Sequence, residues 1–247
     1  MTTTTTASPV KGPTSVGRID PRSAAMMRRA TWAAVATAGL LIVAKFAAYV
    51  STDSVSVLST LLDSMLDAAA SMVNLVAVRT ALQPADREHR FGHGKAEPLA
   101  GLGQSTFIAG SALFLLFEVG NRLINPQPVE RGAVGIAAYI LFTAWQIARG
   151  AFDMLMDREL PDAERARIRA LALANPAVRA VHDLRTRGAG PKSFVQLHLE
   201  MDAGISLIEA HKVSDDVERT IVSEFPGAEV IIHQDPEGID EPRATFA

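Results

Sequence analysis

The sequence predicts a membrane-spanning all-α bundle of four transmembrane helices, followed by a small α+β domain. The first observation behind this fold class is the presence of four long apolar runs in a chain of 247 residues that is 48% hydrophobic. The mean hydropathy of +0.16 is high for a soluble protein of this size. The second observation is a change, from about residue 157 onward, to the short alternating segments of a soluble domain.

The composition also excludes some classes of function. With 24 Lys and Arg against 27 Asp and Glu, the chain has no basic excess, so we expect no nucleic-acid partner. There are no cysteines, so any metal must be held by histidines and carboxylates. Neither a nucleophile nor a complete catalytic metal shell is evident, so we expect no enzymatic activity.

Residues 1–29 are predicted to form a disordered tail, because Thr, Pro, Ser and Gly dominate its first 20 positions. Residues 30–156 are predicted to form the transmembrane domain. A helix of about 20 residues crosses a hydrocarbon core about 30 Å thick. The apolar runs cover residues 31–50, 54–82, 96–124 and 132–156. A cleaved signal peptide is the alternative for the first run, but a long segment precedes it and Lys45 interrupts it.

Basic residues set the expected orientation of these helices in the lipid bilayer. They precede the first run, crowd the loop between the second and third runs, and follow the fourth. By the positive-inside rule, both termini and that middle loop are cytoplasmic.

Two aspartates stand inside the second run, where an ionised carboxylate costs roughly 2.5–3.5 kcal/mol on insertion scales. Asp63 and Asp67 lie about 40° apart around a helix axis and about one turn apart along it. They belong to a polar stripe with Ser56, Thr60, Ser71 and Asn74. For Ser71 and Asn74 we expect hydrogen bonds between helices. For Asp63 and Asp67 we predict that both carboxylates bind one cation.

The loop "PADREHRFGHGKAE" carries a second candidate site. Asp86, His89 and His93 follow one another at spacings of three and four residues. One carboxylate and two imidazoles suit zinc, iron(II) or manganese. Taken alone, His and Asp in a polar loop are more often simply solvated, although Gly92 and Gly94 would let the backbone turn around an ion.

Residues 157–236 are predicted to fold as αββαβ, with a three-stranded sheet covered by two helices, and residues 237–247 as a C-terminal tail. Four histidines fall in this domain: His182, His198, His211 and His233. Strand alternation points His198 away from the apolar face and puts His233 and Asp235 on one face, where they could bind a metal together. Four unrelated surface histidines remain the alternative.

Taken together, these motifs resemble the cation diffusion facilitator family. The resemblance is carried by "SVLSTLLDSMLDAAASMVN", "QPADREHRFGHGKAEPLAG", "QSTFIAGSALFLL", "HDLRTR", "HLEMD" and "IIHQDP". Bacterial ferrous-iron and zinc efflux transporters are the most similar members. The resemblance implies proton-coupled export of divalent cations by a homodimer in the bacterial inner membrane, with a metallochaperone-like cytoplasmic domain.

The resemblance also assigns roles to residues. It implies that Asp63 and Asp67 are half of a transport site, and that Asp86, His89 and His93 form a second site. It implies a regulatory cluster of two metals near the dimer contact, built from His182, His198, His211, His233 and Asp235. Lys95 and Asp157 match a charge pair that links the two domains. The resemblance implies that divalent metals are both substrate and regulator: zinc or iron(II), with manganese, cobalt and cadmium as further candidates.

One departure from the family pattern is serious. Members have six membrane helices, and a His-x-x-x-Asp pair on the fifth completes the transport site. Here no histidine lies between His93 and His182. Compared with the family pattern, we expect the fourth and fifth helices to be absent, with a join near Gly135 and Ile136. We therefore expect impaired transport. The alternative is a membrane-anchored metal-binding dimer that does not transport.

Overall fold

The computed structural model describes residues 21–124 and 133–239, and contacts between Cα atoms divide the chain into two compact units. The first unit contains the helices α1 (Pro21–Thr52), α2 (Val55–Ala81), α3 (Ala96–Ile124) and α4 (Ala133–Leu155). Each is long and apolar enough to cross a membrane, which confirms the predicted four-helix membrane part.

The N-terminal boundary of α1 differs from the prediction. Residues 1–20 of the predicted tail lie outside the described residues, but residues 21–29 form the first turns of α1. Pro21 suits the first helical position because it needs no hydrogen-bond acceptor for its nitrogen. The alanines and arginines that follow are good helix formers, so low hydrophobicity here does not mean disorder.

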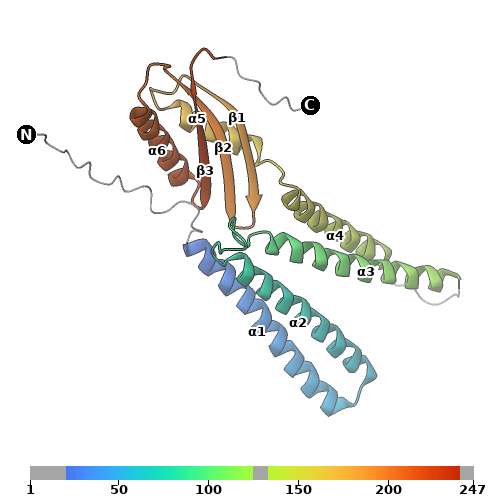
Figure 1. Ribbon diagram of the computed structural model, residues 1–247. Coiled ribbons are helices and arrows are strands. Elements are labelled where there is room, and N and C mark those ends of the chain that lie inside the picture. Colours follow the sequence, from blue (N-terminus) through green and yellow to red (C-terminus); the bar gives the residue numbers. More distant parts are fainter. Residues whose placement is uncertain (1–20, 125–132, 240–247) are drawn as a thin grey trace, which may run out of the picture. The chain divides into compact units, whose positions relative to one another are not determined.

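The helices pair as two hairpins, α1 with α2 and α3 with α4 (Figure 1). Small side chains form their seams. In α1 the buried residues recur every seven positions at Ala24, Thr31 and Ala38. The same spacing occurs in the second hairpin at Ser105, Ala112 and Val119 of α3 and at Ala137, Ala144 and Ala151 of α4. A seven-residue repeat keeps one narrow stripe against the partner helix, and small residues let the two backbones approach closely.

The second unit contains α5 (Asp162–Leu173), β1 (Ala180–Ala189), β2 (Lys192–Met201), α6 (Leu207–Glu224) and β3 (Ala228–Pro236). This order is the predicted αββαβ. The sheet has the order β1-β2-β3, and β2 and β3 are parallel because α6 carries the chain back between them. A capping box starts α6: the Ser206 hydroxyl accepts from the Glu209 N–H, and the Glu209 carboxylate accepts from the Ser206 N–H.

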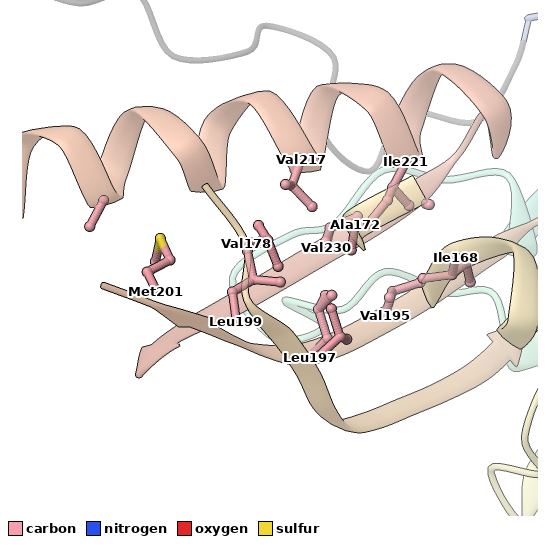
Figure 2. Close-up of a cluster of buried hydrophobic side chains, with 13 residues drawn as sticks. Ile168, Ala172, Val178, Val195, Leu197, Leu199, Met201, Val217, Ile221 and Val230 are labelled. Atoms are coloured by element: carbon pink, nitrogen blue, oxygen red, sulfur yellow. The ribbon is translucent and has the colours of Figure 1, made fainter. Parts of the chain in front are cut away.

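The hydrophobic core of this unit lies between the sheet and its two helices (Figure 2). Leu197 and Leu199 of β2 are fully buried against Ile168 of α5 and Val217 and Ile221 of α6. Since successive side chains of a strand point to opposite faces, the intervening residues of β2 lie on the face without helices. That open face carries the candidate metal ligands of this unit.

Candidate metal centres

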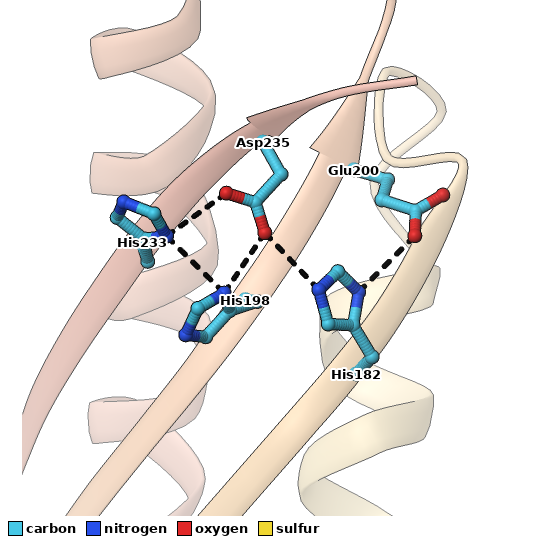
Figure 3. Close-up of polar contacts among 5 residues, drawn as sticks. All are labelled: His182, His198, Glu200, His233 and Asp235. Atoms are coloured by element: carbon cyan, nitrogen blue, oxygen red, sulfur yellow. Dashed lines mark hydrogen bonds and ion pairs between the residues drawn. The ribbon is translucent and has the colours of Figure 1, made fainter. Parts of the chain in front are cut away.

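The strand register brings four of the predicted ligands together on the open face of the sheet (Figure 3). His198 of β2 pairs with His233 of β3, and Glu200 pairs with Asp235. His182 joins them from β1. The carboxylate of Asp235 is at the centre of the group and only 6% exposed.

The distances show how closely these groups converge. Asp235 Oδ2 lies 2.8 Å from His198 Nδ1 and 3.1 Å from His182 Nε2. Asp235 Oδ1 lies 2.9 Å from His233 Nδ1, and the Nδ1 atoms of His198 and His233 are 3.2 Å apart. Imidazole nitrogens and a carboxylate directed at a common point are the donor set that zinc and iron(II) accept.

One buried oxygen at the centre of this cluster fits a metal ligand. Asp235 Oδ1 has no partner in hydrogen-bond geometry among the described residues, although His233 Nδ1 lies 2.9 Å away. Buried polar atoms normally have such a partner. A metal ion bound by Asp235 and the neighbouring histidines would supply one, so the residues present fit a metal centre.

Sequence reasoning assigned no role to Glu200, which contacts this cluster. Its Oε1 lies 3.2 Å from His182 Nδ1, and both side chains are more than four-fifths buried. His182 therefore stands between two carboxylates, Glu200 at one ring nitrogen and Asp235 at the other. A carboxylate beside a metal-binding histidine fixes the orientation and tautomer of its ring.

The remaining predicted ligand of this set, His211, lies elsewhere. It is on α6, where its Nε2 is 3.7 Å from Asp215 Oδ2. Within the described chain, the structure does not bring His211 into the cluster of His182, His198, His233 and Asp235. The apolar spacing of α6 in the sequence did not indicate that His211 would lie apart from the ligands on the sheet.

The loop between α2 and α3 brings Asp86, His89 and His93 together, as their spacing suggested. Asp86 Oδ1 is 3.4 Å from His89 Nδ1, and Asp86 Oδ2 is 3.4 Å from His93 Nε2. The backbone N–H of His89 donates to Asp86 and lowers the pKa of that carboxyl, so it stays ionised and able to bind a cation. His93 Nδ1 is buried without a hydrogen bond to any described residue. Gly92 has φ of 82°, which only glycine adopts readily, and turns the loop back.

Asp63 and Asp67 lie on a flank of α2 rather than on its buried face. The buried face of α2 contains Leu61, Ser64 and Leu75, whereas both aspartates are exposed within this chain. No described residue forms a hydrogen bond or ion pair with either carboxylate. Asp67 and Ser64 line a cavity of about 280 Å³ beside α1. The polar stripe therefore lacks a facing helix among those described.

Lys95 and Asp157 form the predicted charge pair. Lys95 Nζ lies 2.9 Å from Asp157 Oδ1 and donates to the backbone oxygen of Leu155 at 3.3 Å. The contact ties the start of α3 to the end of α4.

Comparison with known proteins identifies the family. The sequence model of the cation efflux transmembrane domain matches residues 31–132, and that of the cytoplasmic domain of cation efflux proteins matches residues 160–237. The cation-efflux pump FieF of Klebsiella pneumoniae is 38% identical over 282 residues, covering 87% of this chain and 94% of that protein. The chain belongs to the cation efflux family. This is a family of cation transporters and not of enzymes, as the sequence predicted.

Further similar proteins also bear the names of cation transporters. FieF of Yersinia enterocolitica is 37% identical over 289 residues, covering 90% of this chain and 96% of that protein. Similar solved structures include the zinc transporter CzrB in a zinc form, 40% identical, with 35% of this chain and 99% of that chain covered and a TM-score of 0.33. The metal-bound C-terminal domain of CzcD from Thermotoga maritima is 26% identical, with 32% and 93% covered and a TM-score of 0.31. These TM-scores are low, so family membership rests on the sequence relatives.

The alignments with these cation efflux relatives contain an internal gap. The Klebsiella alignment spans 282 positions, but 87% of 247 residues is only about 215, so about 67 positions of the relative have no counterpart here. A length of about 67 residues is enough for two membrane helices with their connections. The match to the transmembrane model also ends at residue 132, before α4 begins.

Proposed function

We propose that this protein is a divalent-cation efflux transporter of the zinc and iron(II) class, which exchanges the metal for protons across the bacterial inner membrane. The observation that carries the proposal is a pair of carboxylates, Asp63 and Asp67, which lie one turn apart on α2. This helix is able to span a bilayer, and the chain belongs to the cation efflux family. Metal binding to carboxylates releases protons. Rocking of the helices would expose the site to each side in turn.

We further propose that transport by this form is impaired. Two carboxylates supply at most part of the four-ligand shell that zinc prefers. The family's other two ligands belong to the fifth helix, and the internal alignment gap supports the absence of that helix together with the fourth. The exposed flank that carries Asp63 and Asp67 is where such helices would pack.

The proposed topology has both termini in the cytoplasm, with residues 30–156 in the membrane and residues 157–236 forming the cytoplasmic domain. The basic loop around Arg90 supports this orientation. Since the chain has no cysteine, single cysteines at Asp53 and Arg90 provide a clean test in intact cells. Labelling of Asp53→Cys from outside, and of Arg90→Cys only after permeabilisation, is expected.

The cytoplasmic domain is proposed to bind regulatory metal as a homodimer. Four of the five predicted ligands of the regulatory cluster converge within one chain, and His211 does not. If His211 binds the same metals, it must therefore reach them from a second copy. The match of residues 160–237 to the family's cytoplasmic domain supports such an assembly.

A membrane-anchored metal-binding dimer without transport is the second candidate. It is favoured by the contrast between the donor set that converges on the buried Asp235 and the exposed carboxylates of Asp63 and Asp67, which no other described ligand approaches.

Two measurements on the purified chain separate these functions. Zinc binding is followed by calorimetry, and zinc flux by an indicator sealed inside proteoliposomes. Weak flux that Asp63→Ala abolishes supports the transporter. Zinc binding that depends on Asp235, without any Asp63-dependent flux, supports the anchor and overturns the transport proposal.

A further inference from the structure

An arginine of α2 stacks on a tryptophan of α1, its partner in the first helical hairpin. The guanidinium carbon of Arg79 is 5.0 Å from the centre of the Trp32 ring. That distance is within the range of about 6 Å for a favourable cation–π contact. Trp32 is nevertheless 52% exposed, so the contact leaves about half of its surface for another molecule.

The lengths of the two helices place this contact at the boundary of the hydrocarbon core. Asp53, in the turn between α1 and α2, is exposed, and a carboxylate keeps the turn at the membrane surface. Trp32 precedes Asp53 by 21 residues, which is roughly 32 Å along α1. Arg79 follows Val55, the first residue of α2, by 24 residues, which is roughly 36 Å. Because the core is about 30 Å thick, both side chains reach the headgroup level on the other side, where tryptophan is enriched.

Positive charge gathers around this tryptophan. Arg28 and Arg29 precede Trp32 by four and three residues, so they lie on the same side of α1. Arg28 donates through Nε to the backbone oxygen of Ala24 at 3.4 Å, which leaves its other N–H groups available. Arg28, Arg29 and Arg79 are all exposed. Within residues 21–124 and 133–239, no carboxylate forms an ion pair with any of the three.

The stacking of Arg79 leaves its hydrogen-bond donors free to bind an anion. A guanidinium that lies over a ring uses its face, whereas its N–H groups point outward in its plane. These N–H groups match the oxygens of a phosphate, which arginine binds through two parallel hydrogen bonds. At the membrane boundary, the phosphates within reach are those of lipid headgroups.

We propose that Trp32, Arg79, Arg28 and Arg29 form a binding site for the headgroup of an anionic phospholipid. The guanidinium groups bind the phosphate and the negative charge, and the ring packs on the glycerol and the first acyl carbons. The alternative is a structural contact in which Arg79 only fastens α2 to α1. A fastener confers no preference for one lipid over another. The proposal is independent of the proposed transport function.

The test measures which phospholipid contacts Trp32 in a bilayer. The chain has two tryptophans, so Trp145→Phe leaves Trp32 as the only one. The full chain is reconstituted in mixtures of phosphatidylglycerol and phosphatidylcholine, with bromine on the acyl chains of one lipid or of the other. Bromine quenches tryptophan fluorescence on contact. The two quenching curves therefore give the relative association constant of the anionic lipid at Trp32.

Four variants are compared in this background. Arg79→Gln removes one charge of the site, and the double variant Arg28→Gln with Arg29→Gln removes the other two. Arg79→Lys keeps the charge. Arg149→Gln is the matched control, because Arg149 is an exposed arginine of α4, in the other hairpin.

The parent is expected to prefer phosphatidylglycerol at Trp32 by at least about ten-fold, and Arg79→Gln to lower this preference about five-fold. The double variant should lower it at least as much, whereas Arg79→Lys and Arg149→Gln should stay within about two-fold of the parent. Equal association of the two lipids in the parent, or absence of quenching by either, overturns the proposal. So does an equal loss in Arg79→Gln and Arg149→Gln, which would show attraction to the general surface charge.

One further arm separates a lipid headgroup from a soluble anion of the same chemistry. Excess inorganic phosphate is added to the reconstituted parent. An unchanged preference for phosphatidylglycerol supports the lipid site. Loss of the preference would show that free phosphate occupies these arginines, and it would overturn the assignment to a lipid.

Discussion

His182 and Asp235 approach to 3.1 Å although they lie on the two outer strands of the sheet, β1 and β3. Neighbouring strands are about 4.8 Å apart, so the two side chains meet above the central strand β2. His198 of β2 completes the contact at 2.8 Å. Asp235 thus connects all three strands at one point, and the proposed metal centre depends on it.

Replacing this carboxylate tests that dependence. Asp235→Asn keeps the size of the side chain but removes the charge that holds a metal between the histidines, so zinc affinity of the cytoplasmic domain should fall at least about ten-fold. Glu229→Gln is the matched control, because Glu229 lies on the same face of β3 outside the cluster. Calorimetry that finds equal affinities for the two variants would remove Asp235 from the site.

Glu200 should act through His182 rather than on the metal. With Glu200→Gln, the His182 ring loses the negative charge that orients it, and we expect zinc affinity to fall about ten-fold. Glu200→Asp keeps the charge on a shorter side chain and should lose less. Nitrogen NMR of the His182 ring reports its tautomer directly. An unchanged tautomer population in Glu200→Gln would contradict this positioning role.

The fragment of residues 157–247 should fold without the membrane helices, since its core is contained within α5, α6 and the sheet. Leu199→Ala, at a fully buried position, should lower the free energy of unfolding by about 2–5 kcal/mol. Ile231→Ala, at a position that is 52% exposed, should change it by less than about 1 kcal/mol. Urea unfolding followed by circular dichroism measures both, and similar losses would argue against this assignment of the core.

One carboxyl predicts a pH dependence of the same fragment. Partial burial raises the pKa of Glu218 and the neighbouring Asp215 adds to the effect, so the ionised form lowers stability at neutral pH. Glu218→Gln should therefore stabilise the fragment at pH 7, by no more than about 0.5 kcal/mol because the site is mostly solvated. The gain should vanish as the pH falls through the raised pKa, where the native carboxyl is already protonated. A gain that is equal at pH 7 and pH 4 would contradict this cause.

Periodicity in the sequence predicted much of this architecture. The four apolar runs became four membrane-capable helices, because length and hydropathy alone decide whether a segment can cross a bilayer. Strict alternation from Phe194 to Met201 placed His198 and Glu200 on the open face of β2. The spacing of Asp86, His89 and His93 also sufficed, since the three residues lie in one short loop.

Local irregularities within a strand and contacts between distant segments could not be predicted from periodicity. Val181 and Leu184 of β1 both pack against the core although they are three residues apart, because Asp183, with φ of 46°, interrupts the alternation. The strand register that pairs Glu200 with Asp235 appears only in the folded sheet. The hydrogen bonds of Lys45 to Thr60 and Ser64 depend on how α1 packs against α2, and the sequence pattern of one helix does not predict that packing.

We propose that this cation efflux protein keeps its metal-binding residues but lacks the helices that complete its transport site. The most direct measurement is zinc flux into indicator-loaded proteoliposomes by two proteins: this chain, and a version with a family-like fourth and fifth helix inserted at the join near Gly135. Each is compared with its Asp63→Ala variant. We predict low flux from this chain, and flux at least about ten-fold higher from the six-helix version, which Asp63→Ala abolishes. Equal flux from the two proteins that survives Asp63→Ala would show that neither Asp63 nor the inserted helices are needed for transport, which contradicts the proposed truncation of the site.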